Sequence, residues 1–443
     1  MPKIPDAPKA SPKTPEKKYT KSGDAPEKLR PYIFHGVDLD YANRQDAIGD
    51  CPFCSREKKF RVNVETGLFR CLVCAEGTAK GGGNMYTFMR AIHQLSMNST
   101  SPAMLDEIRA ERGFMGTQIL TDWGVCVSCT TGDIIVPGYG VDKKLNQLYR
   151  YLKQPEGKYR LIPTPGAGHQ LHGLETYSGE PEWVFLCEGP WDGMALQEAM
   201  RHVKLNPHTN EYALTTDLSE SMVTLFDVVA VPGCNVFNPG WASLFKNKNV
   251  YIVYDNDYPR TNPKTGSPIE SAGYAGSKRV TQILCANKGS VPKGVGYLRW
   301  GDEGQSHSQA FPDGHDVRDH IVGTGTSPED RMGAVADIVA RLENVPYEWV
   351  EQGAVQQEVK SVGVKECNTH AELIAAWKKA MLWGEGLESA LNAMLASCMS
   401  TMLVGDQLWM KIYGPPSCGK STLCEAISTS NHVYAKSSFR GFL

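Results

Sequence analysis

Apolar runs alternate with amphipathic stretches between residues 180 and 330, and this is the strongest regularity along the chain. The apolar runs are short and bounded by turn residues: Trp183–Cys187, Val228–Val231, Val250–Tyr254 and Val295–Trp300. Such runs are typical of buried strands, and strands that alternate with helices favour a parallel sheet. We therefore predict an α/β domain with a central, mostly parallel sheet over 179–325.

Weaker patterns precede this domain. A helix-like run over Met104–Arg112 and a strand-like run over Asp133–Pro137 predict a mixed α+β segment over 99–178. Residues 1–34 carry prolines and lysines and almost no large apolar side chain. Such a segment buries too little surface to offset its ordering entropy, so we predict a disordered basic tail, with weak DNA contact as the alternative.

Helical spacing resumes after the sheet. A helix over Pro328–Glu343 is predicted inside a linker at 326–370. A second helical run, from Ala371 to about Met402, opens a final segment over 371–443. The chain is therefore expected to be multidomain.

Composition narrows the class of protein. The 443 residues are 41% hydrophobic and 21% charged, with a formal net charge of -3, as in ordinary globular proteins. No apolar run reaches the roughly 18 residues that a membrane span needs, and no apolar signal core follows the N-terminus. We expect a cytoplasmic protein without a membrane partner, in a bacterial host cell if phage-encoded.

Four of the 13 cysteines form two tight pairs, Cys51/Cys54 and Cys71/Cys74, with 16 residues between the pairs. Two residues between cysteines let both thiolates reach one metal from a tight turn, and four sulfurs complete the tetrahedral shell of structural Zn²⁺. We predict a small β zinc ribbon over 35–98. Four reduced structural thiols are the alternative.

The spacer between the cysteine pairs reads as a hairpin with basic and aromatic positions. Phe60 and Phe69 alternate with cations, which suits single-stranded DNA through phosphate neutralisation and base stacking. The alternative is that both phenylalanines form the core of the ribbon. The candidate cations are Arg56, Lys58, Lys59, Arg61 and Arg70.

The run CPFCSREKKFRVNVETGLFRCLVC, followed by Gly81 to Met89, resembles the zinc-binding domain of bacterial and phage DnaG-type primases. The resemblance implies a module that helps choose the initiation sequence. The bacterial version usually has a histidine ligand, whereas the four cysteines here are similar to phage primase-helicases. A lone pair, Cys126 and Cys129, also has knuckle spacing, and we interpret it as structural, with a metal or redox role as the alternative.

Carboxylates follow the predicted strands. Glu188 ends the first strand, Asp255 and Asp257 end the third, and Asp316 and Asp319 follow the fourth. Function in open α/β sheets gathers at the carboxyl ends of strands, and alternate residues of a strand point the same way. Clustered acids repel one another, and hard Mg²⁺ (or Mn²⁺) relieves that repulsion while binding substrate phosphates.

Strand-Glu-Gly, then strand-Asp-x-Asp, then Asp-x-x-Asp resembles the TOPRIM domain of primases, topoisomerases and some nucleases. The resemblance implies Glu188, Asp255 and Asp257 as catalytic magnesium ligands, with Asp316 and Asp319 as further ligands. For any single acid, capping of a turn is the alternative. The zinc module ahead of this domain favours primase over the other classes.

The segment between these modules also resembles the basic N-terminal half of the primase core. Arg150, Lys153, Lys158 and Arg160 are expected to contact template or nucleotide, and a solvated basic strand is the alternative.

A phosphate loop of the G-x-x-x-x-G-K-S type follows a short apolar strand (Leu408–Tyr413) and precedes a helix (Thr422–Ile427). Its backbone amides, lysine and serine hydroxyl would bind ATP phosphates and Mg²⁺. Only 22 residues follow Ser421, so we expect the opening of a P-loop NTPase and little ATP hydrolysis by this chain alone. The predicted ATP-binding residues are Gly414, Ser417, Gly419, Lys420 and Ser421.

These features together predict a DNA primase that makes short RNA primers, as part of a phage-type primase-helicase. Expected partners are a single-stranded DNA template, ribonucleoside triphosphates, and a replicative helicase or replisome, and we expect a monomer. Two alternatives remain from the sequence: a TOPRIM nuclease, and a non-catalytic zinc-dependent DNA-binding or helicase-recruiting factor.

Overall fold

The computed structural model of the chain divides into two compact units, Met1–Val359 and Lys360–Leu443. The residues that it describes are 25–41, 45–74, 80–154, 159–206, 208–286, 291–302, 305–350, 369–380 and 386–400. No helix among these residues is long and apolar enough to cross a membrane.

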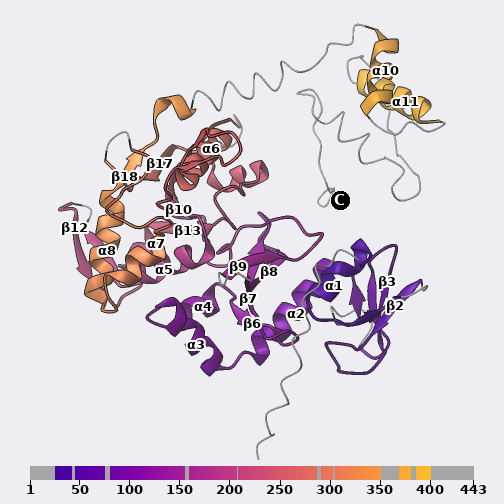
Figure 1. Cartoon of the computed structure of the whole chain (residues 1–443), viewed down its shortest axis with the longest axis horizontal. Coiled ribbons are helices and arrows are strands. Elements are labelled where there is room, and N and C mark those ends of the chain that lie inside the picture. The colour runs from indigo at the N-terminus through magenta and orange to yellow at the C-terminus, as the bar shows by residue number, and fades with distance from the viewer. Residues whose placement is uncertain are drawn as a thin grey trace, which may run out of the picture. The chain divides into compact units, whose positions relative to one another are not determined.

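A five-stranded sheet forms the centre of the α/β domain that the alternating pattern predicts (Figure 1). Four of its strands are parallel, and the edge strand β18 is antiparallel to β17. In spatial order the strands are β13 (Phe226–Ala230), β10 (Trp183–Cys187), β14 (Asn249–Val253), β17 (Gly294–Leu298) and β18 (Leu342–Asn344). Because β18 belongs to this sheet, the sheet extends beyond residue 325 into the predicted linker.

Helices cover both faces of this sheet, which explains why its strands are continuously apolar. One face carries α5 (Pro190–Arg201), α7 (Val317–Gly323) and α8 (Pro328–Ala340), which pack together in one core. The other face carries η3 (Pro239–Phe245) and α6 (Ala272–Ala286) over a second core.

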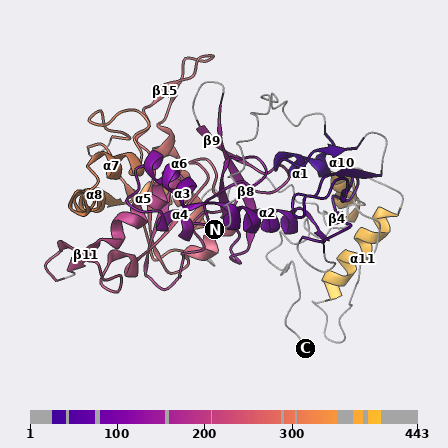
Figure 2. The same cartoon turned by 90° about the horizontal axis from the view of Figure 1, so that it is seen from below.

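Short elements extend from the main layers. Two hairpins leave the sheet domain, β11 (Val203–Asn206) with β12 (Glu211–Leu214), and β15 (Arg260–Thr261) with β16 (Pro268–Ile269). A 3-10 turn, η2 (Met222–Thr224), precedes β13. The β15 hairpin projects at the edge of the molecule in Figure 2.

The mixed segment ahead of this sheet contains two helices and a separate antiparallel sheet. Ser101 accepts a hydrogen bond from the Met104 amide and Pro102 starts the first helix, which Gly113 caps at its C-terminus with a left-handed φ of 74°. The elements are α3 (Pro102–Arg112), α4 (Gln118–Asp122), β6 (Cys126–Val127), β7 (Ile134–Tyr139), β8 (Leu145–Lys153) and β9 (Tyr159–Pro163).

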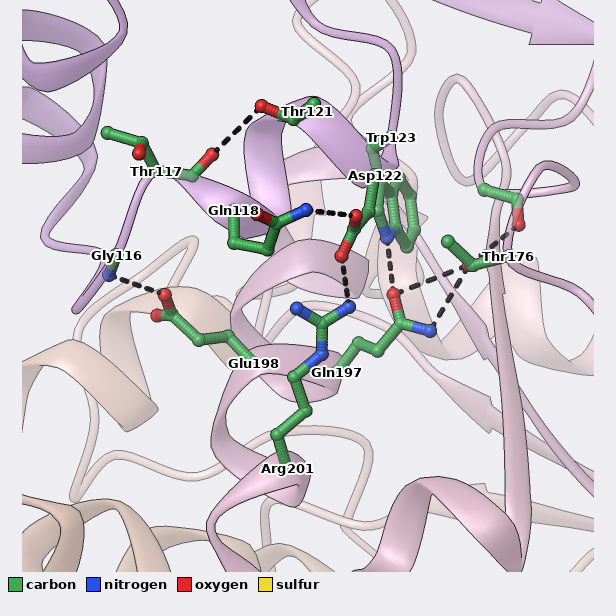
Figure 3. A network of polar contacts seen from close by, with 11 residues as sticks. Gly116, Thr117, Gln118, Thr121, Asp122, Trp123, Thr176, Gln197, Glu198 and Arg201 are labelled. Carbon is green, nitrogen blue, oxygen red and sulfur yellow. Dashed lines mark hydrogen bonds and ion pairs between the residues drawn. The ribbon is translucent and has the colours of Figure 1, made fainter. Parts of the chain in front are cut away.

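Polar contacts fix this mixed segment on α5, the helix that follows the first acid (Figure 3). The buried indole nitrogen of Trp123 donates to Gln197 at 2.5 Å. The carboxylate of Glu198 accepts from the amide of Gly116 at 2.9 Å. Because these groups are satisfied within the protein, α5 is held in one position relative to the segment before it.

The predicted zinc module forms a five-stranded antiparallel sheet that packs on a long helix. Asn84 caps that helix by accepting from the amides of Tyr86 and Thr87, each at 3.1 Å. The elements are β1 (Leu39–Asp40), β2 (Asp46–Gly49), β3 (Phe60–Asn63), β4 (Phe69–Cys71), β5 (Gly82–Gly83) and α2 (Met85–Ser99).

The segment before this module corrects the predicted tail. Residues 25–34 were placed in the tail, but η1 (Glu27–Leu29) and α1 (Arg30–Phe34) are helical. Leu29 and Tyr32 are fully buried, because their side chains complete the core of the zinc module. The remainder of the predicted tail lies outside the described residues.

The second unit contains two described helices, α10 (His370–Ala380) and α11 (Leu387–Ser400), within the predicted helical run. Ile374, Leu391 and Met394 bury their side chains together between them.

A buried histidine makes the first unit sensitive to acid. His172 is fully buried with Nδ1 2.8 Å from the Pro137 carbonyl oxygen, and burial lowers its pKa from 6.5 to about 4. Between pH 6.5 and pH 4 the unfolded chain binds a proton at His172 that the folded chain does not bind. The stability that is present above pH 6.5 is therefore lost as the pH falls toward 4.

Between pH 6.5 and pH 4, we therefore expect His172 to lower the free energy of unfolding of the wild type by on the order of 3 kcal/mol. A His172→Asn variant should not show this part of the decrease. Urea unfolding of both proteins at pH 7 and pH 4.5, about the limits of the transition, measures the difference. Parallel pH dependences of the two proteins would contradict the assignment.

Candidate functional site

The four predicted cysteine ligands converge on one point. The sulfur atoms of Cys51, Cys54, Cys71 and Cys74 all lie within 4.8 Å of one another. Cys51 Sγ is 3.8 Å from Cys74 Sγ, and Cys54 Sγ is 3.7 Å from Cys71 Sγ. Four sulfurs at about 2.3 Å from a tetrahedral Zn²⁺ would be about 3.8 Å apart, so the geometry fits a closed structural zinc site.

The aromatic residues of the ribbon do not face solvent. Phe60 and Phe69 are 0% and 3% exposed, and their rings stack on each other at 5.3 Å between centroids. The alternative interpretation therefore holds, because alternation along both strands turns these side chains into the ribbon core. They are not available for stacking on bases.

The cations of the ribbon have mixed positions. Arg56, Lys58 and Lys59 are exposed, and Arg61 is half-buried. Arg70 is exposed and pairs with Asp46 at 3.2 Å. The exposed cations form the part of the module that could meet phosphates.

The lone pair Cys126 and Cys129 has a structural environment. Cys126 is fully buried in β6, and Cys129 is exposed with its amide bonded to Ser96 Oγ at 3.2 Å. Neither belongs to a metal-sized cluster among the residues that the structure describes.

The first two acids meet at the carboxyl edge of the parallel sheet. Glu188 directly follows β10, Asp255 lies two residues after β14, and these strands are neighbours in register, with Cys187 opposite Val253. The Asp255 amide donates to Glu188 Oε2 at 3.3 Å. The topology therefore brings together two acids that lie 67 positions apart in sequence.

The other predicted acids surround this edge. Asp257 Oδ2 accepts from the Gly273 amide at 2.9 Å, at the start of α6. Asp316 caps α7 by accepting from the Asp319 amide at 2.5 Å. The Asp319 carboxylate points outward, is 45% exposed and pairs with Arg318.

The inner acids are half-buried and lie close to like charges. Burial, then the charges of Glu188, Asp192 and Asp316, raise the pKa of Asp255 well above its ordinary value. Burial and Asp257 raise the pKa of Glu188 to about 7. Burial also raises the pKa of Asp316 to about 6. Carboxyls in this state favour neutralisation by a proton or by a cation.

Asp192 is a buried acid close to this edge that the sequence interpretation did not include among the site residues. It is 6% exposed in the first turn of α5, and its Oδ1 accepts from the Arg318 amide at 3.2 Å. Burial and Asp316 raise its pKa. Acids are common in the first turn of a helix because the helix dipole stabilises them there, so Asp192 did not stand out in the sequence. Its position four residues after Glu188 was the available signal.

The donor set suits hard divalent cations. All of these groups offer carboxylate oxygen, the ligand that Mg²⁺ takes, and Asp255 Oδ1 is buried without a hydrogen-bond partner. A buried carboxylate oxygen without a partner fits a metal ligand. Among the described residues these acids are not gathered into one ion-sized sphere, as the cysteines are, but span a wider face.

The basic residues of β8 and β9 fall into different environments. Arg150 was predicted to contact template or nucleotide, but it is 6% exposed, pairs with Asp133 and donates to the Phe34 carbonyl. The Asp133 carboxylate and the Phe34 carbonyl satisfy the buried guanidinium. Since Phe34 ends α1, Arg150 links α1 to the antiparallel sheet. Lys153 lies over the Tyr159 ring at 5.9 Å, and Arg160 is exposed.

Three of the predictions lie outside the described residues. Lys158 is one, and the phosphate loop with its predicted ATP-binding residues is another. The third is the predicted start of an NTPase domain over 371–443, of which the structure describes only 371–380 and 386–400.

No family model matches the chain, and no curated protein matches it. Solved structures do align with it. The zinc-binding and RNA polymerase domains of the Aquifex aeolicus primase are 16% identical over 70% of this chain and 83% of that chain, with a TM-score of 0.32. The RNA polymerase domain of Mycobacterium tuberculosis primase DnaG is 14% identical over 70% and 97%, with a TM-score of 0.38.

The primase fragment of the bacteriophage T7 primase-helicase protein is 12% identical over 65% of this chain and 95% of that chain, with a TM-score of 0.32. The chain is thus similar to DnaG-type primases and to a phage primase fragment.

Proposed function

We propose that the chain is a DNA primase that synthesises short RNA primers on single-stranded DNA by Mg²⁺-dependent nucleotidyl transfer. One observation carries the proposal. A half-buried carboxylate pair, Glu188 and Asp255, lies at the carboxyl ends of adjacent parallel strands in the same compact unit as a four-cysteine cluster with the geometry of a zinc site. The first site suits phosphoryl transfer and the second suits a structural template-binding module.

The chain's own residues would prepare the reaction. Glu188, Asp255 and Asp257 would hold divalent ions, with Asp192 and Asp316 completing the site and Asp319 at its exposed rim. Bound Mg²⁺ or Mn²⁺ would neutralise charge on the attacking 3′-hydroxyl oxygen and the leaving pyrophosphate. Hydrogen bonds from backbone amides hold Glu188, Asp257, Asp192 and Asp316 in place before substrate arrives, so little reorganisation is needed.

Template and partners would meet other surfaces. Arg56, Lys58 and Lys59 of the ribbon are exposed and would neutralise phosphates of single-stranded DNA. Lys153 and Arg160, which are exposed on β8 and β9, are the corresponding candidates on the antiparallel sheet. We further propose that 371–443 begins a helicase-type NTPase that links primer synthesis to a replicative helicase or replisome.

One experiment tests this function against the two alternatives. The 443-residue chain is incubated with single-stranded DNA, labelled ribonucleoside triphosphates and Mg²⁺ or Mn²⁺. Labelled oligoribonucleotides are the expected product. Cut DNA without nucleotide incorporation would indicate a TOPRIM nuclease, and binding without any product would indicate a non-catalytic DNA-binding or helicase-recruiting factor.

A further inference from the structure

Asn256 lies between Asp255 and Asp257 in the segment that follows β14, and its side chain is fully buried. Successive side chains of an extended segment point to opposite faces. Asp255 and Asp257 belong to the acid site, and Asn256 is directed away from it toward the loop 308–315, which leads to Asp316.

Both ends of the Asn256 amide bind that loop. Its Oδ1 accepts from the Ser308 amide at 2.8 Å, and its Nδ2 donates to the Ser308 carbonyl at 2.9 Å. Nδ2 also lies 3.3 Å from the Pro312 carbonyl and 3.4 Å from the Phe311 carbonyl. One side chain therefore satisfies both polar groups of Ser308 and approaches two further carbonyls.

The backbone of Asn256 binds the same loop at its far end. The Asn256 amide donates to the His315 carbonyl at 2.8 Å, and the Gly314 amide donates to the Asn256 carbonyl at 2.9 Å. These two bonds form an isolated antiparallel bridge directly before Asp316. The loop that precedes Asp316 is thus hydrogen-bonded to the residue between Asp255 and Asp257.

Tyr258 adds a separate connection to this loop. Its amide donates to Asp313 Oδ1 at 2.7 Å, and its hydroxyl donates to the Phe311 carbonyl at 2.6 Å. Asn256 and Tyr258 alternate along the chain with Asp255 and Asp257. One face of this extended segment therefore binds the loop, and the other face carries the two carboxylates.

We propose that Asn256 is a positioning residue that sets where Asp316 stands relative to Asp255 and Asp257, and thereby sets the affinity of the acid site for divalent metal. This inference rests on the proposed function for its chemistry. Groups that orient metal ligands in this way typically change metal affinity by roughly 10- to 100-fold when they are removed.

Asparagine is suited to this position because its side-chain amide carries both a hydrogen-bond donor and an acceptor at the same distance from the backbone. Alanine would leave the buried Ser308 amide and the nearby carbonyls without a side-chain partner. Aspartate would keep the acceptor, lose the donor and add a like charge beside buried acids.

The test compares Asn256→Ala with Asn249→Ala in the full-length chain. Asn249 is a matched control because it begins the same strand and bonds only Glu182 through its side chain among the described contacts, at 3.0 Å, at the opposite end from the acids. Binding of Mn²⁺ is titrated by electron paramagnetic resonance, to which bound Zn²⁺ is silent. The Mg²⁺ concentration for half-maximal primer synthesis is measured in parallel.

We expect Asn256→Ala to weaken Mn²⁺ binding by about 10-fold and to raise the half-activating Mg²⁺ concentration similarly, with zinc content unchanged. Asn249→Ala is expected to match the wild type. Equal Mn²⁺ affinity of wild type and Asn256→Ala would overturn the positioning role.

If Asn256→Ala does not fold, Tyr258→Phe decides by the same criterion. This variant is nearly isosteric and loses one hydrogen bond to the loop, so a weakening of about threefold is expected and unchanged affinity overturns the inference. Failure of the proposed function gives a different result, because wild type would then make no primers while Asn256→Ala still weakened Mn²⁺ binding.

Discussion

Replacing Asp255 by asparagine will lower primer synthesis by on the order of 10³-fold, while binding of single-stranded DNA is retained. The substitution keeps the size of the side chain but removes the charge that a divalent ion would bind. Asp255 is the residue of choice because its Oδ1 is buried without a partner, so no other hydrogen bond is broken there. Initial rates of labelled ribonucleotide incorporation measure the effect.

The chain offers a matched pair of controls on the neighbouring strand. Glu188 follows the carboxyl end of β10, and the exposed Glu182 precedes its amino end. Glu188→Gln is expected to behave as Asp255→Asn, and Glu182→Gln as wild type. Undiminished synthesis by Asp255→Asn, or equal losses in both glutamine variants, would contradict the assignment of the acid edge.

Replacing Cys71 by serine will release the zinc and unfold the ribbon. Structural Zn²⁺ contributes about 10 kcal/mol or more to small domains of this kind, which exceeds what the short strands of this module can supply. We expect about one zinc ion per chain in the wild type and almost none in the variant, with loss of hydrogen-exchange protection over β1–β5.

Cys129→Ser is the control for this prediction, because Cys129 is exposed and lies outside the four-sulfur cluster. Its zinc content is expected to equal that of the wild type. A Cys71→Ser protein that keeps its zinc, or a Cys129→Ser protein that loses it, would show that the ligand set is wrong.

Local patterns predicted the frame of the molecule well. The strand Trp183–Cys187 was predicted with its observed bounds, because a parallel strand buried on both faces is continuously apolar. The cysteine spacing is similarly local, and the four sulfurs meet as expected. Strand ends then indicated which acids could share one edge of the sheet.

Burial of charged and aromatic residues was harder to predict. Arg150 was predicted to contact template because its segment resembles the basic half of the primase core, but its partners Asp133 and Phe34 come from other elements. Phe60 and Phe69 alternate with cations, and that alternation is equally compatible with a ribbon core. A sequence does not distinguish these outcomes, because the deciding neighbours lie far away along the chain.

Asn256 shows the same limit at the proposed catalytic centre. Its partner Ser308 lies 52 positions further along the chain, so nothing around Asn256 indicates a role. Asp192 was visible as the start of a helix, and its closeness to the other acids depends on the packing of α5 against α7.

The identity of the product tests the central claim most directly. The wild-type chain is given single-stranded DNA of defined sequence, all four ribonucleoside triphosphates and Mg²⁺, and the products are sequenced. A primase predicts short oligoribonucleotides that are complementary to the template, that change when the template changes and that disappear in Asp255→Asn. Products that do not follow the template, or cleaved template without new RNA, would contradict the account.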